Sequence, residues 1–279
     1  MNTQSSPQNQ FRSAFVRTFN KLKRIREATI FATIIVFSAL ISIFAPNFFS
    51  IDNFRTTAIG MSSDGIIAIG MTVALVSGGF DLSVGSIMGA SSVIAGGLYL
   101  AGVNIWLGCL ISVVICLMLG FFNGVLIGKV GINGFIVTLG MMQMARGIAY
   151  VVTTGSPQSL SSVPAAFDFL GKGNVAGIPF IVLVFIVLAI IGDLRMRNSS
   201  PFRKVFYIGS NQKAASLSGV NVSRIKIGVY LLTSLLSSIA GILPISRFGV
   251  ATPTAGQGTE MRVISAAVIG GASLNGGEG

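Results

Sequence analysis

The sequence predicts an all-α protein, a polytopic transmembrane helical bundle with about eight spans, interrupted helices and an internal two-fold repeat. Of its 279 residues 52% are hydrophobic and 10% are charged, whereas about 25% of residues are charged in an average soluble domain. The hydrophobic residues form long continuous runs, not the alternating strands of about ten residues that build a membrane barrel. A glycine-rich polar motif also occurs twice. These three observations favour helices in a lipid bilayer.

Each expected span is an apolar run of about 17 to 25 residues, the length at which a helix crosses a bilayer. In chain order the runs lie at about 28–45, 57–77, 83–101, 104–128, 131–154, 178–192, 227–247 and 261 to the end. They form one transmembrane domain, 28–279, which follows a basic tail at 1–27.

The positions of the basic residues predict the orientation. Six precede the first span: Arg12, Arg17, Lys21, Lys23, Arg24 and Arg26. Seven more lie in the 193–226 loop: Arg195, Arg197, Arg203, Lys204, Lys213, Arg224 and Lys226. Basic loops stay cytoplasmic, and six spans separate the two groups, an even number. We therefore expect a cytoplasmic N-terminus, a cytoplasmic 193–226 loop and an external 155–177 loop. The net charge of +11 is explained by this pattern, without nucleic acid as a partner.

Several kinds of chemistry are not supported by the residues present. The chain has no histidine, which removes imidazole metal sites and the usual base of a hydrolase triad. Cys109 and Cys116 lie seven residues apart on one span, too far for a disulfide. The nearest approach to a phosphate-binding loop, "GVLIGKV", is one residue short and lies inside a span. We expect no cofactor, no metal and no ATP hydrolysis by this chain alone.

The repeated motif reads "LVSGGFDLSVGS" from residue 75 and "AVIGGASLNGGEG" from residue 267. Interrupted helices in transporters line the substrate pathway. We therefore predict breaks at Gly78, Gly79 and Gly85 and at Gly270 and Gly271. Two further spans follow the first copy, whereas the second stops at Gly279. This predicts a truncated C-terminus, and a glycine face at 120, 124 and 128 that lacks much of its packing partner.

Asp81 stands in the first glycine motif, in one of the most apolar parts of the chain. A carboxylate in the membrane costs about 2.5 to 3.5 kcal/mol on insertion scales, so we expect it to face protein or water. One interpretation is that Asp81 and Ser83 line a translocation pathway. The other is that Asp81 caps the following helix, with Ser83 beside it.

Three other polar residues lie in or near apolar runs. Asp64 can form a buried ion pair with Arg146, as a structural link between two spans. Arg146 can instead extend to the outer membrane surface. Asn123 lies between glycines spaced by four, which favours close helix packing over a channel lining.

The 193–226 loop contains the stretch "FYIGSNQKAASLSGV", which is too polar to span. Asn211 through Leu217 predicts a short amphipathic helix that ends at Gly219. Ala214, Ala215 and Ser218 give this helix a face of small residues. The helix can lie on anionic lipid or bind a partner protein, and we favour the partner.

Four stretches resemble the membrane permease subunits of bacterial ABC importers for monosaccharides and for the sugar-like autoinducer-2: "ALVSGGFDLSVGSIMG", "NGFIVTLGMMQMARG", "YIGSNQKAASLSGV" and "VIGGASLNGGEG". The resemblance runs from about residue 50 to the end. It implies location in the inner membrane, a second permease subunit in a homodimer or heterodimer, cytoplasmic ATP-binding subunits and a periplasmic solute-binding protein. It also implies a coupling helix that contacts the ATPase through Gly209, Asn211, Ala214, Ala215, Ser218 and Gly219.

Two rival functions remain at this stage. A secondary carrier or channel for a small polar solute also uses interrupted helices, but Asp64 and Asp81 are the only clear titratable candidates for ion coupling. An intramembrane enzyme would need a nucleophile and a base, and no plausible pair is visible. A carrier would also leave the basic 193–226 loop unexplained.

Overall fold

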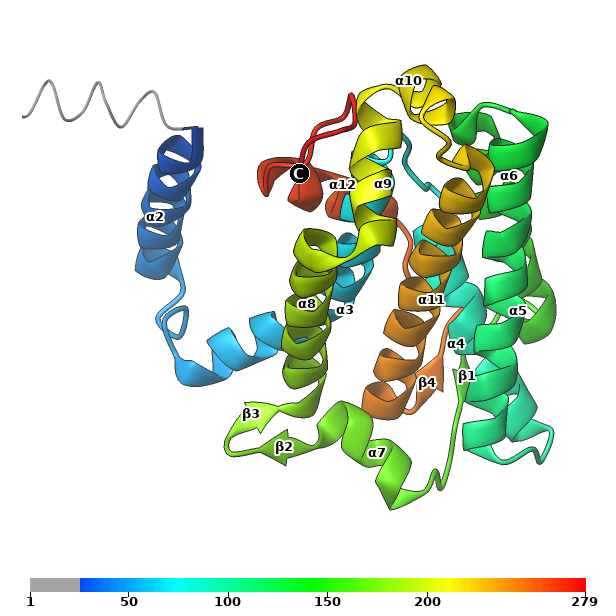
Figure 1. Ribbon diagram of the computed structural model, residues 1–279. Helices are drawn as coiled ribbons and strands as arrows, with labels where there is room; N and C mark the ends of the chain where they lie inside the picture. Colours follow the sequence, from blue (N-terminus) through cyan, green and yellow to red (C-terminus); the bar gives the residue numbers. More distant parts are fainter. Residues whose placement is uncertain (1–25) are drawn as a thin grey trace, which may run out of the picture. The chain divides into compact units, whose positions relative to one another are not determined.

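The computed structural model describes residues 26–279, and they are helical throughout apart from short strands and turns (Figure 1). The all-α prediction is confirmed. The tail residues before Arg26, with their basic cluster, lie outside the described part. The chain divides into one unit that ends at Thr56 and a second unit from Thr57 to Gly279.

The first unit contains α2 (Arg26–Phe44) and the beginning of α3 (Ile51–Val76). A turn separates the two helices, and the Asn53 side chain closes it by donating to the Phe48 carbonyl oxygen at 2.7 Å. The apolar side chains of α2 from residue 31 onward are mostly exposed, as expected for a helix whose solvent is lipid.

The second unit contains the rest of α3 and all later elements. Its helices are α4 (Val84–Leu100), α5 (Ile105–Val125), the π-helical turn η1 (Leu126–Val130), α6 (Gly134–Thr153), α7 (Ala165–Lys172), α8 (Phe180–Asn198), α9 (Ser200–Ser210), α10 (Gln212–Leu217), α11 (Val222–Phe248) and α12 (Thr259–Ile269). Its strands form two antiparallel pairs, β1 (Gln158–Ser159) with β4 (Val250–Ala251) and β2 (Asn174–Val175) with β3 (Ile178–Pro179).

Asparagines begin several of these helices by a common mechanism. The side-chain oxygen accepts a hydrogen bond from a backbone N–H in the first turn, which has no partner within the helix. In the described chain this occurs at Asn104 for α5, Asn133 for α6, Asn211 for α10 and Asn221 for α11. Local sequence therefore determines where each of these helices starts.

α11 forms the centre of the second unit and packs on α5 and α4. The contact is close because small residues line it. The Cβ position of Gly124 on α5 lies 2.6 Å from the Ile227 Cα of α11, and that of Gly128 lies 3.0 Å from the Ser223 carbonyl oxygen. The glycine face of α5 is therefore covered by α11, and the expectation that it lacks a partner was wrong. Small residues at helix contacts are typical of membrane bundles.

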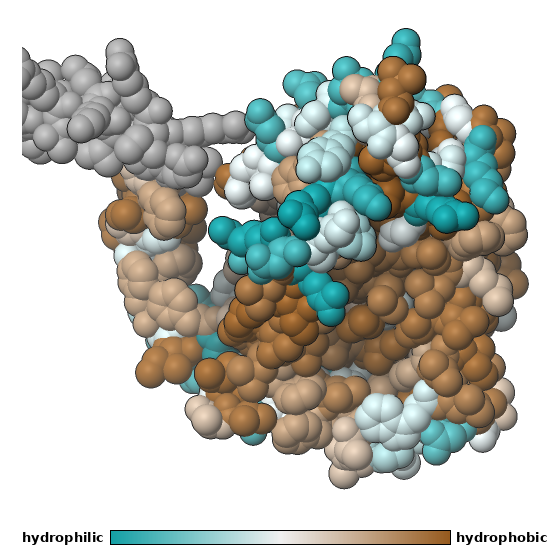
Figure 2. Space-filling view, in the orientation of Figure 1, coloured by the Kyte–Doolittle hydropathy of each residue, from teal (hydrophilic) through white to brown (hydrophobic). Residues whose placement is uncertain are grey.

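Among the residues that the structure describes, four helices are long and apolar enough to cross a membrane: α3, α5 extended by η1, α6 and α11. Val84–Leu100 and Phe31–Phe44 are shorter apolar helices. Figure 2 shows hydrophilic residues gathered at the α10 end of the second unit and apolar residues over the region below it. The composition and the helix lengths therefore indicate a multi-pass membrane protein.

The last predicted span is not a continuous helix. α12 has 11 residues and a length of about 16 Å, about half of the hydrocarbon thickness. It ends at Ile269, and Gly271 then adopts a φ of +114°. The residues from 270 onward form turns, so the prediction of a span from 261 to the end was wrong.

Candidate functional site

The first glycine motif forms a true interruption between α3 and α4. The Gly78 N–H donates to the Leu75 carbonyl oxygen at 2.9 Å, and the Gly79 N–H donates to that of Ala74 at 3.1 Å. With Gly78 at a φ of +80°, these bonds form a Schellman motif, which ends a helix at a left-handed residue. The break is shorter than predicted, because α4 begins at Val84 and Gly85 lies in its first turn.

Asp81 lies in the middle of this break, and none of it is exposed. Its Oδ1 accepts hydrogen bonds from the Ser83 backbone N–H at 2.9 Å and from the Ser83 hydroxyl. Its Oδ2 accepts one from the Thr233 hydroxyl of α11 at 2.7 Å. The carboxylate therefore joins the start of α4 to the centre of α11. Ser83, rather than Asp81, is the N-cap residue of α4, and Asp81 accepts hydrogen bonds from that residue just before the helix. Asp81 lines no open surface in this conformation.

Further residues surround Asp81, and sequence reasoning did not assign them to this site. The Asn123 side chain of α5 donates to the Ser83 hydroxyl oxygen at 3.1 Å and is fully buried. The Tyr230 hydroxyl of α11 lies 3.5 Å from the Phe80 carbonyl oxygen. The polar residues within the apolar α11 were the available signal, but nothing local paired them with a residue about 150 positions away. Asn123 packs inside the bundle, as the glycine spacing around it predicted.

Asp64 and Arg146 do not form the ion pair considered from the sequence. Asp64 accepts from the Arg262 guanidinium of α12 at 2.6 Å. Arg146 donates from Nη1 to the carbonyl oxygens of Pro253 at 2.5 Å and Ala255 at 2.9 Å. Arg146 therefore holds the loop between α11 and α12, whose carbonyls lack helical partners. The short α12 brings Arg262 to Asp64, a placement that only the fold decides.

The two glycine motifs meet in space. The Gly277 N–H donates to the Val76 carbonyl oxygen at the end of α3, at 2.9 Å, and the Cβ position of Gly276 lies 2.7 Å from the Gly78 Cα. The aligned glycines differ in conformation, because φ is positive at the first glycine of one motif, Gly78, and at the second glycine of the other, Gly271. The internal repeat is not shown by this arrangement.

Gly209, near the end of α9, enters the same contact. Its Cβ position lies 2.6 Å from the Gly277 backbone nitrogen and would also clash with the Val76 carbonyl oxygen. Three chain segments thus meet here backbone to backbone: the end of α3, the end of α9 and the C-terminal turns. A side chain at Gly209 would separate them.

The predicted short helix after Asn211 is present as α10. The Asn211 side chain accepts from the Ala214 N–H at 2.9 Å, and Gly219 ends the segment at a φ of +81°. Ala214 and Ser218 are exposed, but Ala215 is buried. The predicted small-residue face is therefore divided, since Ala215 packs against the protein itself. Leu217 is 91% exposed instead, and sequence reasoning missed it.

No group of three metal-ligating side chains lies together in the part of the chain that the structure describes. The arrangement is an interrupted helix fixed by a buried carboxylate, with an exposed short helix beside it. Such a construction suits a protein that changes conformation in a membrane, rather than one that activates a bound substrate chemically.

Comparisons with known proteins agree with this architecture. Residues 53–277 match the family described as "Branched-chain amino acid transport system / permease component". The chain is 35% identical over 265 residues to the "Ribose import permease protein RbsC" of Escherichia coli (strain K12), covering 94% of this chain and 82% of that protein. It is 37% identical over 254 residues to the RbsC of Bacillus subtilis (strain 168), covering 89% and 77%.

A further relative is the "L-arabinose transport system permease protein AraH" of Escherichia coli (strain K12), 35% identical over 252 residues, with 89% of this chain and 76% of that protein covered. No solved structure matches the chain. The family match spans most of the chain, and these identities extend over nearly its whole length. The chain therefore belongs to the family of transport-system permease components, and it is a membrane permease subunit homologous to the ribose and arabinose permeases.

Proposed function

We propose that this chain is the translocation subunit of an ATP-driven importer that carries a monosaccharide or sugar-like solute across the bacterial inner membrane. The ribose and arabinose permeases among its relatives support a sugar as the transported solute, although the family description names amino acids. Separate cytoplasmic ATP-binding subunits supply the energy, a periplasmic solute-binding protein delivers the solute, and a second permease subunit completes the pathway. These partners follow from the resemblance of the motifs and from the relatives' roles in transport.

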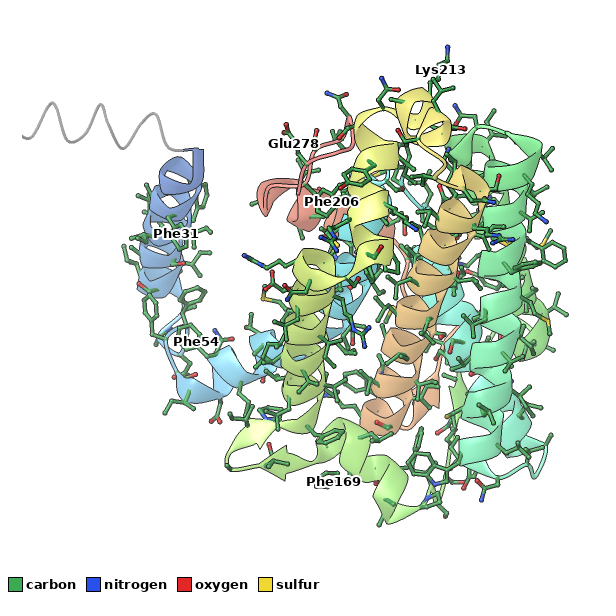
Figure 3. All side chains as sticks on the ribbon, viewed as in Figure 1. Phe31, Phe54, Phe169, Phe206, Lys213 and Glu278 are labelled. Carbon is green, nitrogen blue, oxygen red and sulfur yellow. The ribbon has the colours of Figure 1, made fainter. Side chains whose placement is uncertain are left out.

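The proposal rests mainly on the exposed side of α10. Leu217 is 91% exposed at the hydrophilic end of the unit, and Figure 3 shows the Lys213 side chain pointing away from the body of the protein. Burying a leucine side chain against a partner contributes about 1.5–3 kcal/mol. We assign the ATPase contact to this exposed side, formed by Lys213, Ala214, Leu217 and Ser218, and exclude the buried Ala215.

The two helices that flank α10 both reach the break between α3 and α4. α9 does so through Gly209, which packs on the Val76 carbonyl. α11 is joined to α10 by a hydrogen bond from the Lys226 ammonium to Gln212 Oε1 at 2.9 Å, and to the break by the bond from Thr233 to Asp81. A displacement of α10 by ATP-binding subunits would therefore act on the break from two sides. In this proposal the break opens toward the pathway during the cycle.

The orientation that suits this role has α10 and the N-terminus on the cytoplasmic side. α10 lies at one end of the unit, and α7 with β2 and β3 lies at the opposite end (Figure 1). The basic residues of α8 occupy its last turn, the end that leads into α9 and α10. Basic residues near membrane spans favour the cytoplasm.

Leu217→Glu tests the proposal in membrane vesicles that contain the complete importer. It places a carboxylate where the partner would have to desolvate it, and we expect ATP-dependent sugar uptake and stimulated ATPase activity to fall at least tenfold together. Val175→Glu is the matched control, an exposed apolar residue in the opposite loop, and should leave the ATPase coupling intact. Normal uptake by correctly inserted Leu217→Glu protein, or uptake driven by an ion gradient without ATP, would contradict the proposal.

A further inference from the structure

A cavity of about 360 Å³ lies between α3, α9 and α11. Its lining is apolar apart from one side chain: Val73, Phe202, Val205, Gly228 and Leu232 form the walls, and Arg224 is the charged residue. Cavities of about 300–1,000 Å³ are the usual size for small-molecule sites. The lining offers almost no hydrogen-bonding groups, so it does not suit a sugar.

The lining residues of α11 extend from Arg224 to Leu232. Arg224 lies in the first turn of α11, at the α10 end, and Leu232 lies eight residues further along, a distance of about 12 Å. Figure 2 shows hydrophilic side chains over the α10 end of the unit and apolar side chains below. The cation therefore stands at the polar end of the cavity, and the apolar walls extend away from it.

Arg224 is exposed and forms no ion pair within residues 31–279, the part whose side chains the structure describes. The ion pairs of that part join Lys172 to Asp168, Arg197 to Asp193 and Arg262 to Asp64. No carboxylate is among the residues that line the cavity. The charge at this end of the cavity is complementary to an anion.

We propose that this cavity binds an anionic phospholipid, with one acyl chain between α9 and α11 and the phosphate against Arg224. A phospholipid combines an apolar chain with an anionic group at one end, the same arrangement as the cavity. Anionic lipids of the cytoplasmic leaflet attract basic residues at the membrane surface. A guanidinium binds phosphate oxygens through paired N–H donors.

The full-length protein, purified in detergent and stripped of lipid, allows a direct test by native mass spectrometry. Dioleoyl phosphatidylglycerol and dioleoyl phosphatidylcholine are added at equal concentration, and the retained lipid is measured. We expect the wild-type protein to retain phosphatidylglycerol about fivefold better, which corresponds to the roughly 1 kcal/mol per basic residue at an anionic surface. Arg224→Gln should abolish this preference and leave weak binding of both lipids.

Gly228→Phe tests the apolar part of the site. Gly228 lines the cavity, and its Cβ position meets no atom within 4 Å. The added ring would occupy space meant for the acyl chain, so retention of both lipids should fall. Gly147→Phe on α6 is the matched control, because its Cβ position is equally open and lies outside the cavity. Wild-type retention by both Arg224→Gln and Gly228→Phe would overturn the proposal. A loss of protein dimers in Gly228→Phe with lipid retention unchanged would also overturn it, and would assign the cavity to a second copy of the chain.

Discussion

Asp81 shows how the described part of this bundle accommodates a buried carboxyl group through hydrogen bonds. Its oxygens accept from one backbone N–H and two hydroxyl groups, supplied by Ser83 and Thr233. These donors replace the water that an exposed carboxylate would bind, and hydrogen bonds to a charged group contribute about 1.5–3 kcal/mol each. The Asp81 side chain thereby links the start of α4 to α11.

Asp81→Ala should destabilise the protein more than Asp81→Asn does. Alanine leaves the Ser83 N–H and hydroxyl without their acceptor, and each unsatisfied buried group costs about 1–3 kcal/mol. Asparagine keeps one oxygen for Ser83. In both variants Thr233 can donate to the Tyr230 carbonyl oxygen, which lies 3.0 Å away. Unfolding in mixtures of mild detergent and dodecyl sulfate measures the difference. Equal losses for the two variants would mean that charge, rather than hydrogen bonding, decides the role of Asp81.

Arg146→Leu should loosen the loop between α11 and α12. The substitution removes the donor from the carbonyl oxygens of Pro253 and Ala255, with an expected loss of about 1.5–3 kcal/mol of unfolding free energy. Increased proteolysis within 250–258 gives a second readout. Arg197→Leu is the control, because Arg197 pairs with Asp193 on an exposed helix surface and such pairs contribute little. Unchanged proteolysis in Arg146→Leu would show that the loop is held by other contacts.

At the scale of elements, the contact between α5 and α11 depends on the absence of side chains. Gly120, Gly124 and Gly128 lie on one face of α5 and η1, and each approaches α11 directly. In lipid, helices gain little from the hydrophobic effect when they associate, so close packing and dispersion contacts stabilise them. The glycine spacing is therefore a packing surface.

Gly124→Val should disrupt this contact. The added Cβ would lie 2.6 Å from the Ile227 Cα, a backbone atom that cannot move aside, and overpacking of this kind costs about 1–3 kcal/mol or more. Gly140→Val on α6 provides the control, since its Cβ position meets nothing within 4 Å. In thermal denaturation of the two purified variants, Gly124→Val should have the lower melting temperature. Similar melting temperatures would indicate that α5 can shift along α11 without loss.

At the scale of the whole molecule, the proposed orientation makes a prediction about labelling from one side of the membrane. Lys213→Cys on α10 and Val175→Cys in the opposite loop are both exposed positions, whereas the native Cys109 and Cys116 are buried. In intact spheroplasts, a membrane-impermeant maleimide should label Val175→Cys and leave Lys213→Cys unlabelled until the membrane is permeabilised. The wild-type protein controls for the native thiols. The reverse pattern would invert the topology and remove α10 from the ATPase side.

The sequence by itself determined the features that depend on neighbouring residues. The apolar runs at 104–128 and 131–154 predicted α5 and α6, because a continuous hydrophobic stretch is stable in lipid only as a helix. Gly78 predicted the break after α3, since a Schellman motif needs a left-handed residue. Asn211 and Gly219 predicted the limits of the α10 segment. Hydropathy and capping act over a few residues and are visible in the chain itself.

The tertiary structure alone decided which distant groups meet. Asp81 bonds to Thr233, 152 positions away, and Asp64 pairs with Arg262 rather than with Arg146. Ala215 faces the protein while Leu217 faces outward, because the packing of α10 selects one of its faces. The apolar run from residue 261 was predicted to be a span, but it forms the short α12 followed by turns. Such pairings depend on how helices pack across the bundle, and many partners with similar chemistry were available, so local patterns did not distinguish among them.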